Sequence, residues 1–141
     1  QTMFAEYEKL VHEQVEGGEP ITVESLRKTY RGLLEAYFGS EVELLPESDL
    51  EGLRIPHFYN AFYVYKYATG ISASMALASK VMHGTAADRD RYLAFLKSGG
   101  STYPIDSLRK AGVDMASPEP VRMAAKRFGE ILDQFEKLAG R

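Results

Sequence analysis

Residues 68–79 read ATGISASMALAS, and this stretch decides the fold class. Every side chain in it is small or apolar, so a helix built from it has no strongly polar face. Such a helix is buried on most sides, with neighbours packed close to its backbone. A chain of 141 residues has little room to surround it. We therefore expect part of its cover to come from polypeptide outside this sequence or from a dimer partner.

Helical patterns extend from this stretch in both directions, and no segment reads convincingly as a strand. Glycines and capping residues such as Thr22, Gly39 and Thr85 punctuate the patterns. The sequence predicts an all-α fold of about six helices. The expected helices cover residues 2–16, 23–38, 57–83, 86–97, 104–112 and 118–138. A polar linker over residues 40–54 separates the second helix from the third.

The composition excludes several classes of function. A net charge of −3 gives no electrostatic reason to expect a nucleic acid or an anionic membrane as partner. The longest apolar stretch, between Lys66 and Lys80, is shorter than the roughly 20 residues of a membrane span. The chain has no cysteine, which excludes disulfides, thiolate catalysis and cysteine-zinc sites and fits a reducing compartment. Because the helical pattern is already under way at Gln1, we expect a cut from a longer chain.

The pentapeptide HEQVE, from His12 to Glu16, begins like the zinc-peptidase signature His-Glu-x-x-His. That signature needs a second histidine four positions on, so that both imidazoles lie on one helix face and bind one metal. Glu16 stands there instead. The pattern favours a solvated helix end, and the alternative is a weak metal site of His12, Glu13 and Glu16. His57 and His83 lie too far apart in sequence to suggest another zinc site.

Aromatic side chains crowd the segment before the small-residue stretch. Residues 54–70 read RIPHFYNAFYVYKYATG. A regular helix would place Tyr59, Tyr63 and Tyr67 on one face and point Tyr65 elsewhere. Because a buried phenol needs a hydrogen-bond partner, a row of tyrosines is costly in a plain core. Two interpretations stay open: core packing, and a polar-lined cleft where the phenols and His57 bind a peptide carbonyl or a developing oxyanion.

A glycine pair, Gly99 and Gly100, lies between two expected helices in the segment FLKSGGSTYP, residues 95–104. The pair forms a turn, a hinge, or a place where backbone approaches a ligand closely. The segment lacks the pattern of a phosphate-binding loop, because no Lys-Ser or Lys-Thr follows the glycines at the required position.

These motifs together resemble the C-terminal part of oligoendopeptidase F, in the thimet oligopeptidase-like family of zinc metallopeptidases. The resemblance is carried in order by residues 3–8, 55–70, 96–104 and 108–116 and covers essentially the whole chain. It implies that residues 1–141 are the C-terminal helical part of a peptidase catalytic domain. Members of the family are cytoplasmic, mostly helical and clam-shaped, with a deep channel that admits short peptides.

The resemblance also implies where the metal lies. In the family, a His-Glu-x-x-His helix and a later glutamate bind one Zn²⁺, and all of these residues lie upstream of the part matched here. The expectation is therefore a Zn²⁺ cofactor in the parent enzyme and no metal ligand in this chain. The chain would be inactive alone, with the remainder of the peptidase chain as its partner and short peptides as substrates.

The family pattern implies a role for the aromatic motif opposite the zinc. It makes His57, Tyr63 and Tyr65 catalytic residues that hold the substrate and stabilise the tetrahedral oxyanion. Tyr59 and Tyr67 would bind substrate. Gly99 and Gly100 would bind substrate too, as a mobile or backbone-binding wall of the channel. The alternative is a stand-alone helical module that binds peptides or acts as a scaffold, without catalysis.

Overall fold

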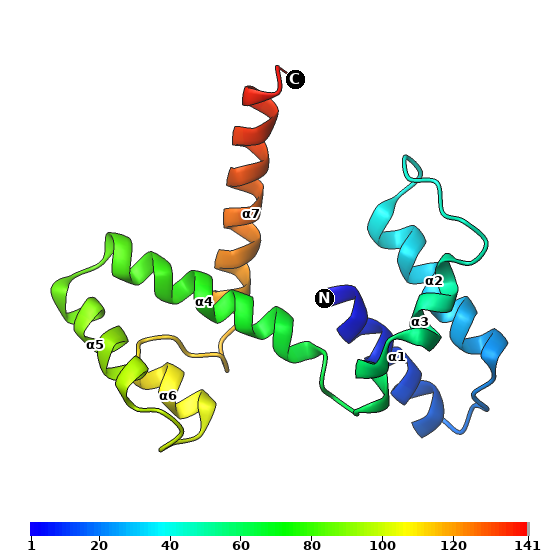
Figure 1. Ribbon diagram of the computed structural model, residues 1–141, viewed down its shortest axis with the longest axis horizontal. Coiled ribbons are helices and arrows are strands. Elements are labelled where there is room, and N and C mark those ends of the chain that lie inside the picture. Colours follow the sequence, from blue (N-terminus) through cyan, green and yellow to red (C-terminus); the bar gives the residue numbers. More distant parts are fainter. Residues whose placement is uncertain (141) are drawn as a thin grey trace. The chain divides into compact units, whose positions relative to one another are not determined.

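The computed structural model describes residues 1–140 and confirms the all-α prediction (Figure 1). The described residues form seven α-helices and two short 3₁₀ helices, joined by loops, and no strand. The chain divides into two compact units, one covering Gln1–Ala68 and one beginning at Thr69. Each unit is built on its own core.

In the first unit, α1 (Thr2–Glu16) and α2 (Val23–Phe38) lie side by side (Figure 1). The start of α2 is fixed by a capping box, in which Thr22 and Ser25 exchange side-chain-to-backbone hydrogen bonds of 3.1 and 2.9 Å. Gly39 ends the helix with a φ of +69°, a value that glycine adopts without strain. Both bounds agree with the sequence prediction because both signals are local.

The core of the first unit lies between these two helices and the segment around residue 58. Its buried members are Met3, Tyr7, Tyr30, Leu33 and Leu34. Three aromatic rings interlock in it: Tyr7 meets Tyr30 edge to face with ring centroids 5.0 Å apart, and meets Phe58 in the same way at 5.0 Å. Edge-to-face contacts of this kind add to the stabilisation from buried area.

The linker expected over residues 40–54 is partly helical, which the sequence prediction missed. It contains the 3₁₀ helix η1 (Ser48–Leu50) and the single-turn helix α3 (Glu51–Arg54). Asp49 fastens it to α2 by ion pairs of 2.8 Å to Arg27 and 3.5 Å to Arg31. The hydrogen bond from Arg27 and the charges of both arginines lower the pKa of Asp49. These tertiary contacts, and not local helix propensity, stabilise so short an element.

The second unit contains most of α4 (Tyr65–His83), with α5 (Ala86–Lys97) and α6 (Pro104–Lys110). A capping box between Thr85 and Asp88 starts α5 as predicted. The core is small-residue packing against α4, and its buried members are Ala73, Ala76, Leu77, Ala111 and Val113. Within the described residues α4 is buried on one side only, since Ile71 and Met82 are exposed. We predict that further polypeptide covers the other side of α4.

The helix α7 (Glu119–Leu138) carries an apolar stripe that is largely exposed. The exposed members are Val121, Met123, Phe128, Ile131, Leu132, Phe135 and Leu138. Side chains of α7 and α4 line a common groove, with Met123 on one side and Met75 and Met82 on the other. Within residues 1–140, none of the helices has the length and apolar character needed to cross a bilayer.

Candidate functional site

The aromatic motif does not form the continuous helix expected from residue 57. Pro56 opens a 3₁₀ helix, η2 (Pro56–Tyr59), which follows the extended residue Ile55. A residue before proline is pushed towards extended backbone, so a boundary there is expected. The chain then turns, and α4 begins only at Tyr65. The predicted helix was therefore right from residue 65 and wrong before it.

Phe62 lies within this break and has an unusual backbone conformation. Its φ is +56°, and it is the one non-glycine residue in the described chain with a positive φ. Such a conformation is uncommon for an aromatic residue and persists only where the surroundings hold it. The Phe62 N–H donates a hydrogen bond of 2.7 Å to Oε1 of Glu8, and the Phe62 ring lies 4.5 Å from the ring of His12. Both partners belong to α1.

The interior side of the motif anchors it to the core of the first unit. Phe58, in η2, packs edge to face against Phe4 and Tyr7, with ring centroids 5.4 and 5.0 Å apart. Val64, just before α4, is almost completely buried. Phe58 and Val64 thus anchor the motif to the core before and after the turn. His57 and Tyr67, in contrast, are exposed.

Three polar rings meet on the outer side of the motif: His57, Tyr63 and Tyr67. Their ring centroids are 5.5 Å apart for His57 and Tyr63, 6.0 Å for His57 and Tyr67, and 5.8 Å for Tyr63 and Tyr67. The Tyr67 hydroxyl donates a long hydrogen bond of 3.5 Å to the Tyr63 hydroxyl. The Lys66 ammonium lies 4.9 Å from the centre of the Tyr63 ring. We call His57, Tyr63 and Tyr67 the polar ring cluster.

The hydrogen bond within this cluster favours the neutral form of Tyr67. The hydrogen bond to Tyr63 raises the pKa of Tyr67 above its usual value, because the donated hydrogen is held more firmly. Tyr67 is exposed and Tyr63 is half-buried, so both residues can be reached at least in part from solvent. A neutral phenol is a hydrogen-bond donor, and donors of this kind bind carbonyl oxygens and oxyanions.

The other two tyrosines of the motif lie differently. Tyr59 is the last residue of η2, and both Tyr59 and Tyr63 precede α4. The shared face predicted for Tyr59, Tyr63 and Tyr67 required one regular helix, and that helix does not form. The Tyr59 hydroxyl donates to the Leu53 carbonyl oxygen at 2.7 Å, while the residue as a whole is 78% exposed. Tyr65 is the first residue of α4 and is 48% exposed. Two positions from Tyr67, it leaves the helix on another side, as the sequence predicted.

The glycine pair forms the turn between α5 and α6 in the second unit. Gly99 has a φ of +54°, which explains one of the two glycines. A Cβ added at either Gly99 or Gly100 would meet nothing within 4 Å in the described chain. The open space around Gly100 leaves its backbone accessible. Packing within the described chain therefore does not demand a glycine at position 100.

The described residues do not fit a zinc site. Residues 1–140 contain no group of three or more His, Cys, Asp or Glu side chains that could hold a metal ion. His12 contributes elsewhere: its Nδ1 donates to the Glu8 carbonyl oxygen at 2.7 Å, and its ring packs on Phe62. Glu13 pairs with Lys9 at 3.5 Å on the exposed side of α1. These contacts favour the structural interpretation of the HEQVE segment.

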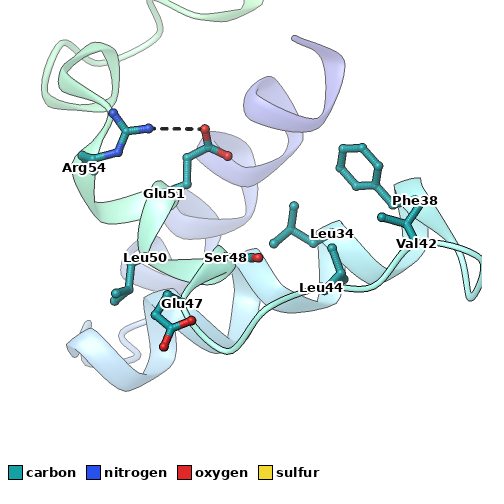
Figure 2. Close-up of a pocket in the computed structure, with 9 residues that line it drawn as sticks. All are labelled: Leu34, Phe38, Val42, Leu44, Glu47, Ser48, Leu50, Glu51 and Arg54. Atoms are coloured by element: carbon teal, nitrogen blue, oxygen red, sulfur yellow. Dashed lines mark ion pairs between the residues drawn. The ribbon is translucent and has the colours of Figure 1, made fainter.

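A separate pocket of about 440 Å³ lies in the first unit, lined by the last turns of α2 and by residues from the segment 42–54 (Figure 2). Leu34, Phe38, Val42, Leu44 and Leu50 make most of its wall. Figure 2 shows the Arg54–Glu51 ion pair, of 3.5 Å, at its rim. None of the lining residues belongs to the polar ring cluster.

Comparison with known proteins identifies the family. The model described as Peptidase family M3 matches residues 1–127. The chain belongs to peptidase family M3. Among its M3 relatives, oligopeptidase PepF of Bacillus subtilis is 52% identical over 138 residues, which is 98% of this chain and 21% of the relative. Chromosomal oligoendopeptidase F of Lactococcus lactis subsp. cremoris is 46% identical over the same share of this chain and 23% of its own length.

A solved relative supports the same family. The crystal structure of oligoendopeptidase-F from Enterococcus faecium matches with a TM-score of 0.89 and 41% identity, over 98% of this chain and 27% of that chain. The chain thus spans about a fifth to a quarter of the M3 proteins that it matches. The helices described above are a fragment of that larger fold.

The sequence had indicated the aromatic motif and the glycine pair, but it had missed Glu8. No local signal points to Glu8, because its partner Phe62 is 54 residues away. The polar ring cluster joins His57 and Tyr63, from the predicted catalytic set, with Tyr67, from the predicted binding set.

Proposed function

We propose that the chain is the C-terminal helical part of the catalytic domain of a cytoplasmic zinc metalloendopeptidase that hydrolyses short peptides. Its membership of the M3 family and its similarity to oligoendopeptidases over 98% of its length support this proposal. In this proposal the remainder of the polypeptide is the partner that supplies the zinc ligands and the general base. Residues 1–140 contain no group of three or more His, Cys, Asp or Glu side chains that could hold a metal ion.

The role of this chain is to bind the substrate and to stabilise charge that develops on the scissile carbonyl oxygen. The observation that carries this role is the polar ring cluster, which presents an imidazole and two phenols on one exposed side of the motif. Tyr67 donates its hydrogen to the Tyr63 oxygen, so the hydrogen of Tyr63 is directed away from Tyr67. Tyr63 is therefore the phenol best placed to donate to a bound carbonyl oxygen.

The other motif residues take secondary parts in this proposal. Tyr65, on another side of α4, is the second candidate for the oxyanion donor. Tyr59 offers an exposed ring face to the substrate, because its hydroxyl is already bonded to Leu53. Gly99 and Gly100 offer accessible backbone amides as a wall of the peptide channel. All of these assignments follow the family resemblance of the motif.

The test is made in the full-length peptidase with Tyr63→Phe and Tyr65→Phe. We expect the variant that lacks the oxyanion donor to lose turnover by on the order of 10²–10³, with a smaller change in KM, because the lost hydrogen bond forms in the transition state. Tyr92→Phe is the control, since Tyr92 packs with Phe95 in the core of the second unit. Full turnover in both Tyr63→Phe and Tyr65→Phe would remove the motif from the catalytic site.

A further inference from the structure

Glu8 is a buried carboxylate that the proposed mechanism does not use. It lies on α1 and is 5% exposed. Glutamate is rarely this buried unless it has a partner. Its partner is the backbone N–H of Phe62, which donates to Oε1 at 2.7 Å. A bond from an amide to an ionised acceptor is shorter and stronger than one between neutral groups.

This hydrogen bond stabilises the backbone at a residue whose conformation is unfavourable by itself. Phe62 has a φ of +56°, a conformation that costs an aromatic residue free energy unless it is compensated. His12, one helical turn along α1 from Glu8, packs against the Phe62 ring at 4.5 Å. The His12 ring is itself fixed by its hydrogen bond to the Glu8 carbonyl oxygen. Glu8 therefore binds the backbone of Phe62, and His12, one turn further along α1, contacts its side chain.

We propose that Glu8 is a positioning residue for the polar ring cluster and acts through Phe62. Tyr63 directly follows Phe62, and Val64 then anchors the chain in the core. The direction of the backbone at Phe62 therefore sets where the Tyr63 ring meets His57 and Tyr67. Loss of the Glu8 acceptor leaves Phe62 free to adopt a negative φ, which moves Tyr63 relative to its two neighbours. This inference rests on the proposed function of the motif.

The experiment measures kcat and KM of the full-length peptidase with Glu8→Ala, Tyr63→Phe and both changes together. We expect Glu8→Ala to lower kcat by on the order of 10- to 100-fold with little change in KM, the usual cost of a misplaced catalytic group. In the Tyr63→Phe background, the same change should add little, because it acts through the hydroxyl that is already missing. Fully multiplicative effects on kcat would mean a general structural role and overturn the proposal.

Two conservative variants keep the test decisive if Glu8→Ala does not fold. Glu8→Gln keeps an oxygen at the same reach, whereas Glu8→Asp keeps the charge but withdraws it by one methylene. Positioning predicts that Glu8→Gln retains most of the turnover and that Glu8→Asp loses more. Glu8→Asp with the turnover of the unchanged enzyme would overturn the proposal. Glu13→Ala, on the exposed side of α1, is the matched control and should behave as the unchanged enzyme.

The two proposals fail in different ways. If Tyr63→Phe leaves kcat unchanged, the role of Tyr63 in the proposed function is wrong, and so is any positioning of it by Glu8. If Tyr63→Phe lowers kcat while Glu8→Ala leaves it unchanged, the proposed function stands and only the positioning role is overturned.

Discussion

The Tyr30 hydroxyl donates a hydrogen bond of 2.9 Å to Oε2 of Glu51, and so joins the centre of α2 to the helix α3. Tyr30 is completely buried. Its burial, and then the bond to the Glu51 carboxylate, raise the pKa of Tyr30 above its usual range. Burial likewise raises the pKa of the adjacent Tyr7 to about 12.

These two phenols should make the first unit sensitive to alkali. The folded state keeps both hydroxyls protonated to a higher pH than the unfolded state, whose tyrosines ionise near pH 10. Their contribution to stability is therefore complete below about pH 10 and is lost as the pH rises through the folded-state values. Urea unfolding at pH 8, 10 and 11 should give a falling free energy of unfolding. Tyr7→Phe should flatten this decline, and a decline equally steep without the Tyr7 hydroxyl would contradict the assignment.

Gly52 should tolerate no side chain. A Cβ added there would lie 2.7 Å from the Tyr30 ring, which is completely buried, so the ring or the backbone would have to shift. We expect Gly52→Ala to lower the free energy of unfolding by about 1–3 kcal/mol, the usual cost of overpacking. Chemical denaturation of the unchanged protein and of the Gly52→Ala variant measures this difference in the free energy of unfolding.

The matched control for that substitution is Gly32→Ala, in the interior of α2. A Cβ at Gly32 meets nothing within 4 Å, so alanine should stabilise the helix by about 0.5–1 kcal/mol. Equal effects of the two substitutions would show that contact with Tyr30 is not what excludes a side chain at Gly52.

The hydrogen bond within the polar ring cluster can be seen by titration. Tyr63→Phe removes the oxygen that accepts from Tyr67, so the pKa of Tyr67 should fall towards its ordinary value. NMR titration with ¹³C-labelled tyrosine follows Tyr67 directly, and Tyr92→Phe, outside the cluster, should leave that pKa in place. A Tyr67 pKa that does not respond to Tyr63→Phe would contradict the hydrogen bond.

The exposed stripe of α7 distinguishes a piece of a peptidase from a stand-alone module. If the chain needs the rest of its parent, residues 1–141 produced alone should bind a hydrophobic dye such as ANS strongly and self-associate, because Phe128 and Phe135 are exposed. Replacing both with glutamate should reduce the dye fluorescence. A monodisperse chain with weak dye binding would support the stand-alone module.

The sequence predicted those elements whose signals are local. Thr22 and Thr85 marked the starts of α2 and α5, and glycines marked the ends of α1 and α2. The helix α3 was missed because it exists through contacts at a distance. One is the ion pair of Asp49 with Arg27, and another is the close approach of Gly52 to Tyr30. Neither can be seen in the short segment itself.

The same limit explains the error in the aromatic motif. Its tyrosine spacing favours a helix, and periodicity gave no sign of the positive φ at Phe62. That φ depends on Glu8, which lies in another helix. Helical spacing alone therefore grouped Tyr59 with Tyr63 and Tyr67, whereas tertiary structure groups His57 with them. The family resemblance had already placed His57 in the catalytic set.

The link from Glu8 to Phe62 also bears on whether the aromatic motif could be transplanted. A designer who grafts residues 54–70 onto another helical scaffold would copy every tyrosine and still lose the turn that orients them. The smallest portable unit includes the part of α1 from Glu8 to His12, held at the right distance from the graft. The residues of the motif come from one segment of the chain, but its conformation depends on two.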